Sequence, residues 1–260
     1  MHHALGLAQQ ALGTTSPNPS VGAVLVRDGD IVGEGFTQPA GQAHAEVVAI
    51  GQAGEQARGA TLYVTLEPCC CFGRTPPCTQ AIIQAGVSEV HLALFDPNPL
   101  VEGKGKTELE EVGIRVVVGE EETACRKLNE AYFKFITTGS PLVIAKIATS
   151  LDGKIATSSG ETRWITGEVA RRRAHRLRAT SDAVLVGIGT MLADDPQLTA
   201  RDEHDRPLSR QPLRVIMDSL GRTPDTARLF REPGPVLLVG AAIPHGREKA
   251  LKERGAELVQ

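Results

Sequence analysis

Aromatic side chains are scarce in this chain of 260 residues, of which they make up 3%. Proteins that bind single-stranded nucleic acids usually stack bases on aromatic side chains beside a basic groove. The formal net charge is −3, and the short basic run Arg171-Arg172-Arg173 lies in a helix-like stretch, where a solvated helix face is the simpler interpretation. The composition therefore argues against a nucleic-acid partner.

The sequence also lacks a run of 18 apolar residues, and its N-terminus has no charged region followed by an apolar core. Five cysteines are present, four of them between Cys69 and Cys78. Such crowding favours metal ligation in a reducing compartment over a disulfide framework. We therefore expect a cytoplasmic protein without a membrane partner.

Three ligand-type side chains and one carboxylate have a spacing typical of hydrolytic zinc sites. His44-Ala45-Glu46 is followed by Glu67-Pro68-Cys69 and then by Cys78. One imidazole and two thiolates leave the fourth position of a zinc ion open to water, whose pKa then falls from roughly 15.7 to about 7. Glu46 is close enough to the histidine to move protons without ligating the metal. This order of residues is typical of zinc-dependent nucleobase deaminases.

The loop between the two cysteine ligands is longer than the Cys-x-x-Cys of cytidine and tRNA-adenosine deaminases. Eight residues separate Cys69 from Cys78, and Arg74 is the single cation among them. We interpret the loop as holding part of the substrate, with Arg74 binding a phosphate, and a rigid surface loop is the alternative. Cys70 and Cys71 are alternative metal ligands, although adjacent side chains point in different directions.

Strand and helix patterns alternate through the first half of the chain. We expect strands at 23–26 and 31–35 paired around Asp28-Gly29, a helix at 44–53, a strand at 61–66, a helix at 78–85 ended by Gly86, strands at 87–95 and 114–118 separated by a helix at 107–112, and a last helix at 120–136. The segment Gly139-Ser140-Pro141 indicates a boundary, so domains are expected at 1–139 and 140–260.

A second alternating pattern follows the boundary. It predicts strands at 142–147, 183–187, 213–217 and 236–239, helices at 168–179 and 247–254, and the start of a further strand at 257–260. From this pattern we expect the second domain to be incomplete at its C-terminal end. Gly187-Ile188-Gly189 follows a strand, but no third glycine stands at the spacing of a dinucleotide-binding fingerprint.

Motifs throughout the chain carry a resemblance to one family. They are Thr15-Ser16-Pro17-Asn18-Pro19, His44-Ala45-Glu46, Thr65-Leu66-Glu67-Pro68-Cys69, Gly73-Arg74-Thr75-Pro76-Pro77-Cys78, Ser150-Leu151-Asp152-Gly153-Lys154, Trp164-Ile165-Thr166 and Leu192-Ala193-Asp194-Asp195-Pro196. Together they resemble the bifunctional riboflavin-biosynthesis deaminase/reductase family over essentially the whole chain.

The resemblance implies a fold and two reactions. The fold would be a cytidine-deaminase-like three-layer α/β/α domain followed by a dihydrofolate-reductase-like α/β domain. The first domain would deaminate 2,5-diamino-6-ribosylamino-4(3H)-pyrimidinone 5′-phosphate with Zn²⁺. The second would use NADPH to reduce the ribosyl group of 5-amino-6-(5-phosphoribosylamino)uracil to ribityl. A homodimer is a further implication.

The resemblance also implies roles for individual residues. It implies that Glu46 is the catalytic residue and that zinc is bound by His44, Cys69 and Cys78. Contacts with the deaminase substrate are implied for Asn18 and Arg74. NADPH contacts are implied for Ala148, Trp164, Thr190, Asp194 and Ser219, and contacts with the reductase substrate for Thr162, Arg178, Leu198 and Arg201. Two arginines suit a phosphorylated sugar independently of the resemblance.

Three positions depart from the family pattern. Thr37, Val48 and Cys71 stand where the family usually has histidine. They motivate the alternative that the first domain binds zinc without turning over substrate and serves as a scaffold for the reductase. A deaminase acting on nucleic acid is a third interpretation, which the charge, the few aromatics and the long cysteine loop all oppose.

Overall fold

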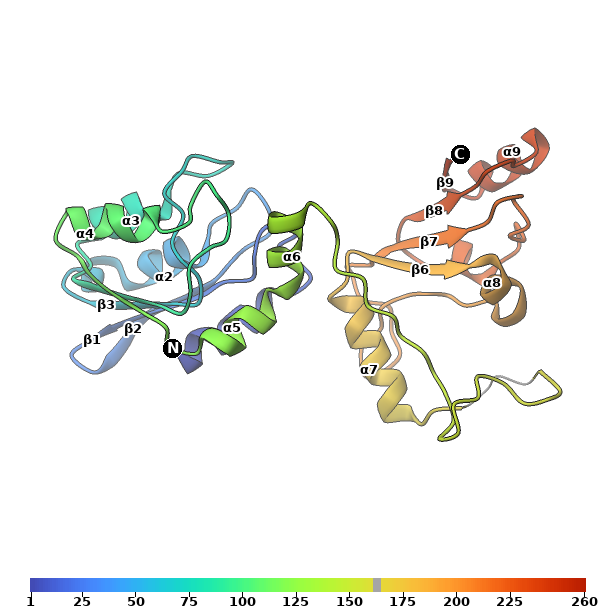
Figure 1. Cartoon of the computed structure of the whole chain (residues 1–260), viewed down its shortest axis with the longest axis horizontal. Helices are drawn as coiled ribbons and strands as arrows, with labels where there is room; N and C mark the ends of the chain where they lie inside the picture. Colours follow the sequence, from blue (N-terminus) through green and yellow to red (C-terminus); the bar gives the residue numbers. More distant parts are fainter. Residues whose placement is uncertain (161–164) are drawn as a thin grey trace. The chain divides into compact units, whose positions relative to one another are not determined.

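The structure of the chain is a computed structural model, which describes residues 1–160 and 165–260. The chain folds into two compact units, Met1–Val143 and Ile144–Gln260 (Figure 1). Each unit has its own sheet and its own buried apolar cluster. The domain limits expected from the sequence lie a few residues before this division and stay a prediction.

The first unit is built on a five-stranded sheet in the order β2-β1-β3-β4-β5. Its strands are β1 Gly22–Arg27, β2 Asp30–Phe36, β3 Thr61–Val64, β4 Glu89–Leu92 and β5 Arg115–Val118. β1 pairs antiparallel with β2 and β3, whereas β3, β4 and β5 run parallel. The hairpin predicted around Asp28-Gly29 is confirmed, since these residues connect β1 to β2 with positive φ angles. β3 and β4 are shorter than predicted because their flanking residues leave the ladder.

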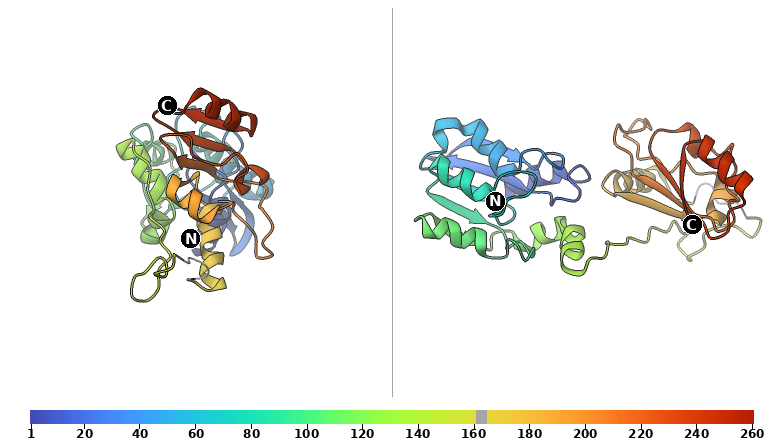
Figure 2. Two further views of the ribbon diagram at one scale, coloured as in Figure 1. Left: turned by 90° about the vertical axis from the view of Figure 1, so that its right-hand side faces the viewer. Right: turned by 90° about the horizontal axis from the view of Figure 1, so that it is seen from above.

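Helices cover both faces of this sheet. They are α1 His2–Ala11, α2 Ala45–Ala53, α3 Cys78–Ala85, α4 Lys104–Glu111, α5 Glu122–Leu128 and α6 Glu130–Thr138, with a 3₁₀ turn at Gly54–Ala57. α2, α3 and α4 lie on one face, and α1 and α5 lie on the other (Figure 1). Seen from above in Figure 2, α2 and α3 lie in front of the strands. The three-layer α/β/α arrangement expected from the sequence is confirmed.

Two glycines on β2 allow α2 to approach the sheet closely. A Cβ atom on Gly33 would lie 2.2 Å from the carbonyl oxygen of Ala49, and one on Gly35 would lie 2.7 Å from that of Ala45. Any other residue at these positions would push the helix outward. Because α2 begins directly after His44, this contact fixes the height of the histidine above the sheet.

The single helix expected at 120–136 is wrong, since α5 and α6 are separate helices that meet at Asn129. The buried Asn129 side chain accepts a hydrogen bond from the Ser20 N–H at 2.8 Å and donates one to the Ser20 carbonyl at 2.9 Å. The backbone of Asn129 has a φ of −102° and a ψ of 19°, which lie outside the regular helical values. This pair of hydrogen bonds connects the end of the first unit to the loop that contains Asn18.

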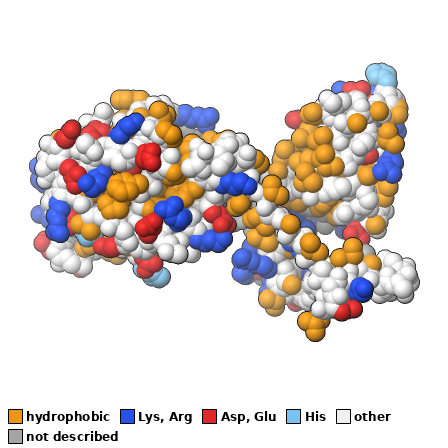
Figure 3. Space-filling model, in the orientation of Figure 1, with side chains coloured by type: hydrophobic (Ala, Val, Ile, Leu, Met, Phe, Trp, Pro, Cys, Tyr) orange, Lys and Arg blue, Asp and Glu red, His pale blue; other side chains and the backbone are white. Residues whose placement is uncertain are grey.

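The second unit contains four parallel strands in the order β6-β7-β8-β9. The strands are β6 Ala183–Gly187, β7 Leu213–Met217, β8 Val236–Val239 and β9 Ala256–Val259, and the helices are α7 Glu168–Ala179, α8 Ile188–Asp194 and α9 His245–Glu253, with a 3₁₀ turn at Arg228–Arg231. One face of the sheet is packed under Met191, Leu229 and Leu251. Leu185, Met217 and Val259 are exposed, and Figure 3 shows hydrophobic side chains gathered on this unit.

The strand expected at 142–147 is absent from the structure. These residues are irregular, with Val143 79% and Ile147 71% exposed. A β-branched sequence becomes a strand only when a neighbouring strand takes up its backbone hydrogen bonds. Within the described residues, no strand of the β6–β9 sheet pairs with this segment.

Candidate metal centre and reductase site

His44 precedes the first turn of α2 in an extended conformation, and Glu46 lies within that turn. The Glu46 side chain is buried, with 4% of its surface exposed. The helix start thus brings the imidazole of His44 and the carboxylate of Glu46, two residues apart in the chain, close to the same group of cysteines.

The two cysteines reach the histidine from the segment after β3. Cys78 is the first residue of α3, and its N–H donates to the Cys69 sulfur at 3.3 Å. His44 Nδ1 lies 3.6 Å from Cys69 Sγ and 3.3 Å from Cys78 Sγ. In the described part of the chain, this is the one group of His, Cys, Asp or Glu ligand atoms close enough to hold a metal ion, all three within 4.8 Å of one another.

These distances fit a zinc ion. Tetrahedral zinc, with bonds of about 2.3 Å to sulfur and about 2.0–2.1 Å to nitrogen, places neighbouring sulfur and nitrogen ligands roughly 3.5 Å apart. The donor set of one nitrogen and two sulfurs is the one that zinc prefers, and it leaves a fourth position for water. The site therefore suits a hydrolytic rather than a purely structural zinc ion.

A threonine from the cysteine loop contacts the far side of the imidazole. Thr75 Oγ1 lies 3.4 Å from His44 Nε2. When Nδ1 binds a metal ion, Nε2 carries the proton of the neutral imidazole and can donate a hydrogen bond to the Thr75 hydroxyl. Such outer contacts fix the tautomer and ring orientation of a metal-binding histidine. Sequence reasoning treated Thr75 only as part of a motif, because no local signal connects it to a residue 31 positions away.

Hydrogen bonds and burial shift the pKa values of the ligand side chains and of Glu46. The pKa of Cys69 is lowered to about 4, first because the Cys78 thiol donates a hydrogen bond to it and then because of His44. The pKa of His44 is raised, mainly by its hydrogen bond with Cys69. Burial raises the pKa of Glu46 to about 7, and the charge of Cys69 adds to that effect. The lowered pKa of Cys69 favours its thiolate, which is the form that ligates zinc.

The two expected substrate contacts lie on two different loops of the first unit. Arg74 is exposed in the cysteine loop and makes no ion pair within the described part of the chain. Asn18 is half-buried, and its loop leads into β1, where the Gly22 N–H donates to Thr65 Oγ1 at 3.0 Å. Thr65 begins the motif that ends at Cys69, so the Asn18 loop and the metal loop start from adjacent strands.

The three altered positions differ in their surroundings. Thr37 is buried, and its hydroxyl accepts a hydrogen bond from the Val21 N–H at 3.1 Å, so its side chain supports the backbone. Val48 lies half-buried on α2, and a Cβ on Gly35 would lie 2.7 Å from its Cβ. Cys70 contacts the Leu100 carbonyl at 3.8 Å rather than the ligand group, and Cys71 is half-buried.

The expected NADPH contacts of the second unit stand mostly at one sheet edge. Thr190 is exposed in the first turn of α8, which follows β6, and Asp194 ends that helix. Ser219 follows β7, the parallel neighbour of β6. The carboxyl ends of parallel strands form the usual ligand-binding edge of such sheets. Ala148 lies in the irregular segment after the first unit, and Trp164 lies outside the described residues.

Ser219 lies in a turn that the buried carboxylate of Asp218 stabilises through hydrogen bonds. Asp218 Oδ2 accepts hydrogen bonds from the Thr223 N–H at 2.7 Å and the Thr223 hydroxyl at 2.8 Å. The Ser219 carbonyl in turn accepts the N–H groups of Ala241 and Ala242. Sequence reasoning did not single out Asp218, although its place between a buried strand and a turn was a usable signal.

The expected contacts with the reductase substrate gather around Thr199. Arg178 on α7 donates to the Thr199 carbonyl at 3.2 Å, and Arg201 donates to the Thr199 hydroxyl at 2.9 Å. Leu198, the adjacent residue, is buried and has a φ of +58°. Burial lowers the pKa of Arg178, and the charge of Arg201 lowers it further. The structure therefore brings three of the four residues together, and Thr162 lies outside the described residues.

Two residues that the sequence did not indicate support this cluster. Glu232 binds Arg201 at 2.9 Å with little exposure of either side chain. Arg214 is buried on β7 and donates to the carbonyls of Gln197 at 3.4 Å and Leu229 at 2.7 Å.

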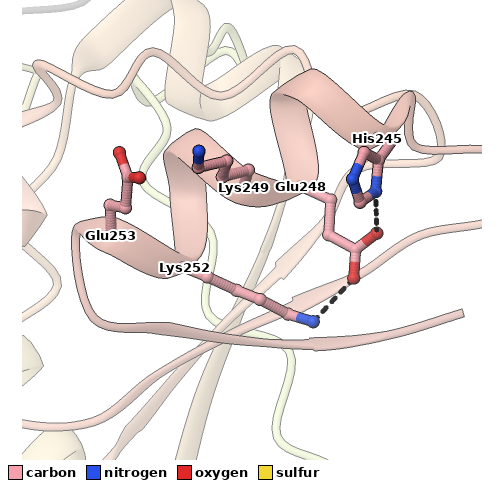
Figure 4. A pocket seen from close by; sticks show the side chains of 5 residues that line it. All are labelled: His245, Glu248, Lys249, Lys252 and Glu253. Carbon is pink, nitrogen blue, oxygen red and sulfur yellow. Dashed lines mark hydrogen bonds and ion pairs between the residues drawn. The ribbon is translucent and has the colours of Figure 1, made fainter.

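A shallow pocket on α9, shown in Figure 4, is lined by residues that the sequence did not indicate as site residues: His245, Glu248, Lys249, Lys252 and Glu253.

Within the described residues, no helix has the length and hydrophobicity needed to cross a membrane.

Two family models match the chain, one in each half. Residues 1–94 match the cytidine and deoxycytidylate deaminase zinc-binding region, which contains all three candidate ligands. Residues 141–257 match the RibD C-terminal domain.

Relatives match across both parts. The riboflavin biosynthesis protein RibD of Aquifex aeolicus is 48% identical over 260 residues, which are all of this chain and 72% of the relative. That of Haemophilus influenzae is 48% identical over 250 residues, 93% of this chain and 67% of the relative.

Solved structures agree with the sequence relatives. Acinetobacter baumannii RibD has a TM-score of 0.88 at 48% identity, with 100% of this chain and 72% of that one covered. The Thermotoga maritima diaminohydroxyphosphoribosylaminopyrimidine deaminase/5-amino-6-(5-phosphoribosylamino)uracil reductase has a TM-score of 0.86 at 38% identity, with 100% of this chain and 79% of that one covered. These matches favour the bifunctional enzyme over the scaffold alternative. The chain belongs to the RibD family of riboflavin biosynthesis, with a zinc-dependent deaminase domain followed by an NADPH-dependent reductase domain.

Proposed function

We propose that residues 1–139 deaminate 2,5-diamino-6-ribosylamino-4(3H)-pyrimidinone 5′-phosphate and that residues 140–260 contribute the reduction of the ribosyl group in the product. The observation that carries the deaminase assignment is the convergence of His44 Nδ1 with the sulfurs of Cys69 and Cys78, at 3.6 and 3.3 Å. Two domains in one chain place the two consecutive reactions on one polypeptide.

His44, Cys69 and Cys78 are the proposed zinc ligands. Bound zinc supplies a Lewis acid that makes water a nucleophile at neutral pH. Glu46 lies in the first turn of α2, next to the ligands and shielded from solvent. In our proposal its carboxylate takes a proton from the attacking water and passes it to the ring nitrogen, and it then moves a proton to the departing ammonia.

Asn18 and Arg74 are proposed to hold the substrate. The half-buried amide of Asn18 offers both a donor and an acceptor to a pyrimidine edge. Arg74 offers a guanidinium on an exposed loop, and a guanidinium binds phosphate oxygens through two parallel hydrogen bonds. A cation in the loop between two metal ligands would place the phosphate at a fixed distance from the reacting ring.

In the second domain, Ala148, Thr190, Asp194 and Ser219 are proposed to contact NADPH, and Trp164, outside the described residues, completes the set. Arg178, Leu198, Arg201 and Thr162 are proposed to bind the sugar phosphate. NADPH supplies the hydride. The protein residues bind and orient the ribosyl group, and Glu232 and Thr199 hold the Arg201 side chain in place.

Two assays on the zinc-loaded chain test this proposal. Ammonia release from the diaminopyrimidine phosphate measures the first reaction, and oxidation of NADPH with 5-amino-6-(5-phosphoribosylamino)uracil measures the second. We expect ammonia release together with one zinc per chain. One zinc per chain without ammonia release would establish the scaffold alternative instead.

We also propose that the enzyme works as a homodimer in the cytoplasm on a small phosphorylated ribosylaminopyrimidine. Five unpaired cysteines suit a reducing compartment. Sedimentation of the purified chain at several concentrations tests the dimer, and a single species with the mass of one chain would contradict it.

A further inference from the structure

Glu67 precedes the Pro68-Cys69 pair, and both of its carboxylate oxygens are occupied by backbone donors. Oε1 accepts the Lys106 N–H at 3.0 Å, and Oε2 accepts the Gly103 N–H at 3.0 Å and the Asp96 N–H at 3.3 Å. The side chain is 4% exposed. A buried carboxylate with three N–H partners has its hydrogen-bonding capacity well satisfied within the protein.

The three donors lie at the two ends of the short loop that connects β4 to α4. Asp96 follows β4, while Gly103 and Lys106 form the start of α4. The first N–H groups of a helix lack partners within the helix, and its N-terminus favours negative charge. Glu67 therefore completes the start of α4 and ties it to the chain after β4.

The next residue is held by direct backbone contact. A Cβ atom on Gly105 would lie 2.2 Å from the Pro68 carbonyl oxygen and 3.2 Å from Glu67 Cγ. The first turn of α4 thus lies against Pro68, one residue before the ligand. The Glu67 N–H also donates to the Leu94 carbonyl at 3.0 Å, so the backbone here is anchored on both sides.

From these contacts we infer that Glu67 is a positioning residue that fixes the backbone carrying Cys69, so that the Cys69 sulfur meets His44 and Cys78 at metal-binding distance. This inference rests on the proposed zinc site. In this inference Glu67, the glutamate of the Glu-Pro-Cys motif, increases the affinity of the site for zinc. Proton transfer remains the role of Glu46.

Glutamine at position 67 would break this arrangement with a minimal change of shape. One of its two end groups is an NH₂ donor, which would face backbone N–H donors from Lys106 or from Gly103 and Asp96. At least one buried N–H then loses its acceptor, and the loop shifts to find another. Changes in such outer contacts typically lower metal affinity by about 10–100-fold.

The experiment measures zinc dissociation constants by competition with a chelator, for the full chain and three variants. Glu67→Gln removes the acceptor, and Gly105→Ala disturbs the same segment through the Pro68 carbonyl. Glu111→Gln, an exposed glutamate on the same helix, is the charge-matched control. Thermal unfolding of the zinc-free proteins establishes that each is folded, and hydrogen exchange of the Asp96, Gly103 and Lys106 amides reports the contacts themselves.

We expect Glu67→Gln and Gly105→Ala to bind zinc at least about tenfold more weakly, with faster exchange of the three amides, and Glu111→Gln to match the unmodified chain. Unchanged zinc affinity in a folded Glu67→Gln protein would overturn the inference. If that variant does not fold, unchanged affinity in Gly105→Ala would overturn it equally. Failure of the unmodified chain to bind zinc would instead overturn the proposed zinc site.

Discussion

The Thr75 hydroxyl lies 3.4 Å from His44 Nε2, on the side of the imidazole away from the two cysteine sulfurs. A loop residue thereby orients the ring that the start of α2 supplies. The hydroxyl can accept a hydrogen bond from Nε2–H, which is compatible with metal binding at Nδ1.

Replacing Thr75 by valine tests this relationship. Thr75→Val keeps the branched shape but removes the acceptor for the imidazole N–H, so zinc affinity should fall by roughly tenfold. Chelator competition measures the change, with Thr138→Val on the exposed end of α6 as a control away from the site. Equal affinity of Thr75→Val and the unmodified chain would show that the ring needs no such partner.

Glu46→Gln should separate metal binding from turnover. The amide cannot accept a proton, so deamination should fall by at least roughly 100-fold, while His44, Cys69 and Cys78 continue to bind zinc. Zinc content by atomic absorption and ammonia release are measured on the same sample. Turnover at the unmodified rate would remove Glu46 from the assigned role.

The three adjacent cysteines should differ in their contribution to zinc binding. Cys69 Sγ lies in the ligand group, whereas Cys70 contacts the Leu100 carbonyl. We expect Cys69→Ser to lose stoichiometric zinc and Cys70→Ser and Cys71→Ser to keep it. Zinc loss in either of the latter two variants would contradict the assigned ligand set.

Asp96 should make the stability of the first domain depend on pH. Burial raises the pKa of Asp96 to about 6, despite hydrogen bonds from the Asn98 N–H and the Tyr132 hydroxyl. Because the folded state holds this proton more tightly than the unfolded state, stability is highest below the unfolded pKa and falls as pH rises toward 6. The total loss is on the order of 3 kcal/mol.

Asp96→Asn should remove that part of the pH dependence, because its side chain oxygen still accepts both hydrogen bonds without a charge. Thermal unfolding between pH 4 and pH 7 measures the effect, and Asp30→Asn, on the exposed start of β2, is the control. Parallel pH profiles for Asp96→Asn and the unmodified chain would refute the assignment.

Arg201→Gln should weaken binding of the phosphorylated sugar in the reductase. The variant removes a cation that Glu232 and Thr199 hold in place, so KM for that substrate should rise at least roughly tenfold while KM for NADPH stays the same. Arg206→Gln, an exposed arginine paired with Asp202, is the control. An equal rise in both KM values would indicate general damage to the domain.

Local signals in the sequence were sufficient for several elements. The predicted limits of α3, α7 and the strands β6, β7 and β8 agree with the structure. In α3 the glycine that ends the helix, Gly86, has the left-handed conformation that few other residues adopt without strain. These elements were predictable because their apolar periods and end signals lie within the segments themselves.

The nature of the metal site was also readable from the sequence, since one imidazole, two thiolates and a nearby carboxylate suit few other chemistries. Their convergence depends on distant parts of the chain. Gly33 and Gly35 let α2 approach β2, and the sheet places α3 beside α2. Only the tertiary structure decided that Thr75 supports the imidazole and that Glu67 holds the start of α4.

Breaks in regular structure were decided by tertiary contacts as well. The pattern at 120–136 favours one helix, but the bond between Asn129 and Ser20, 109 residues apart, divides it into α5 and α6. The apolar residues at 142–147 favour a strand, yet no described strand receives their hydrogen bonds. The sequence by itself determined which residues can ligate zinc and where local elements begin, because those properties are chemical and short-range. The folded chain decided which loops hold the ligands in place, because hydrogen bonds between distant segments form only after the sheet brings them together.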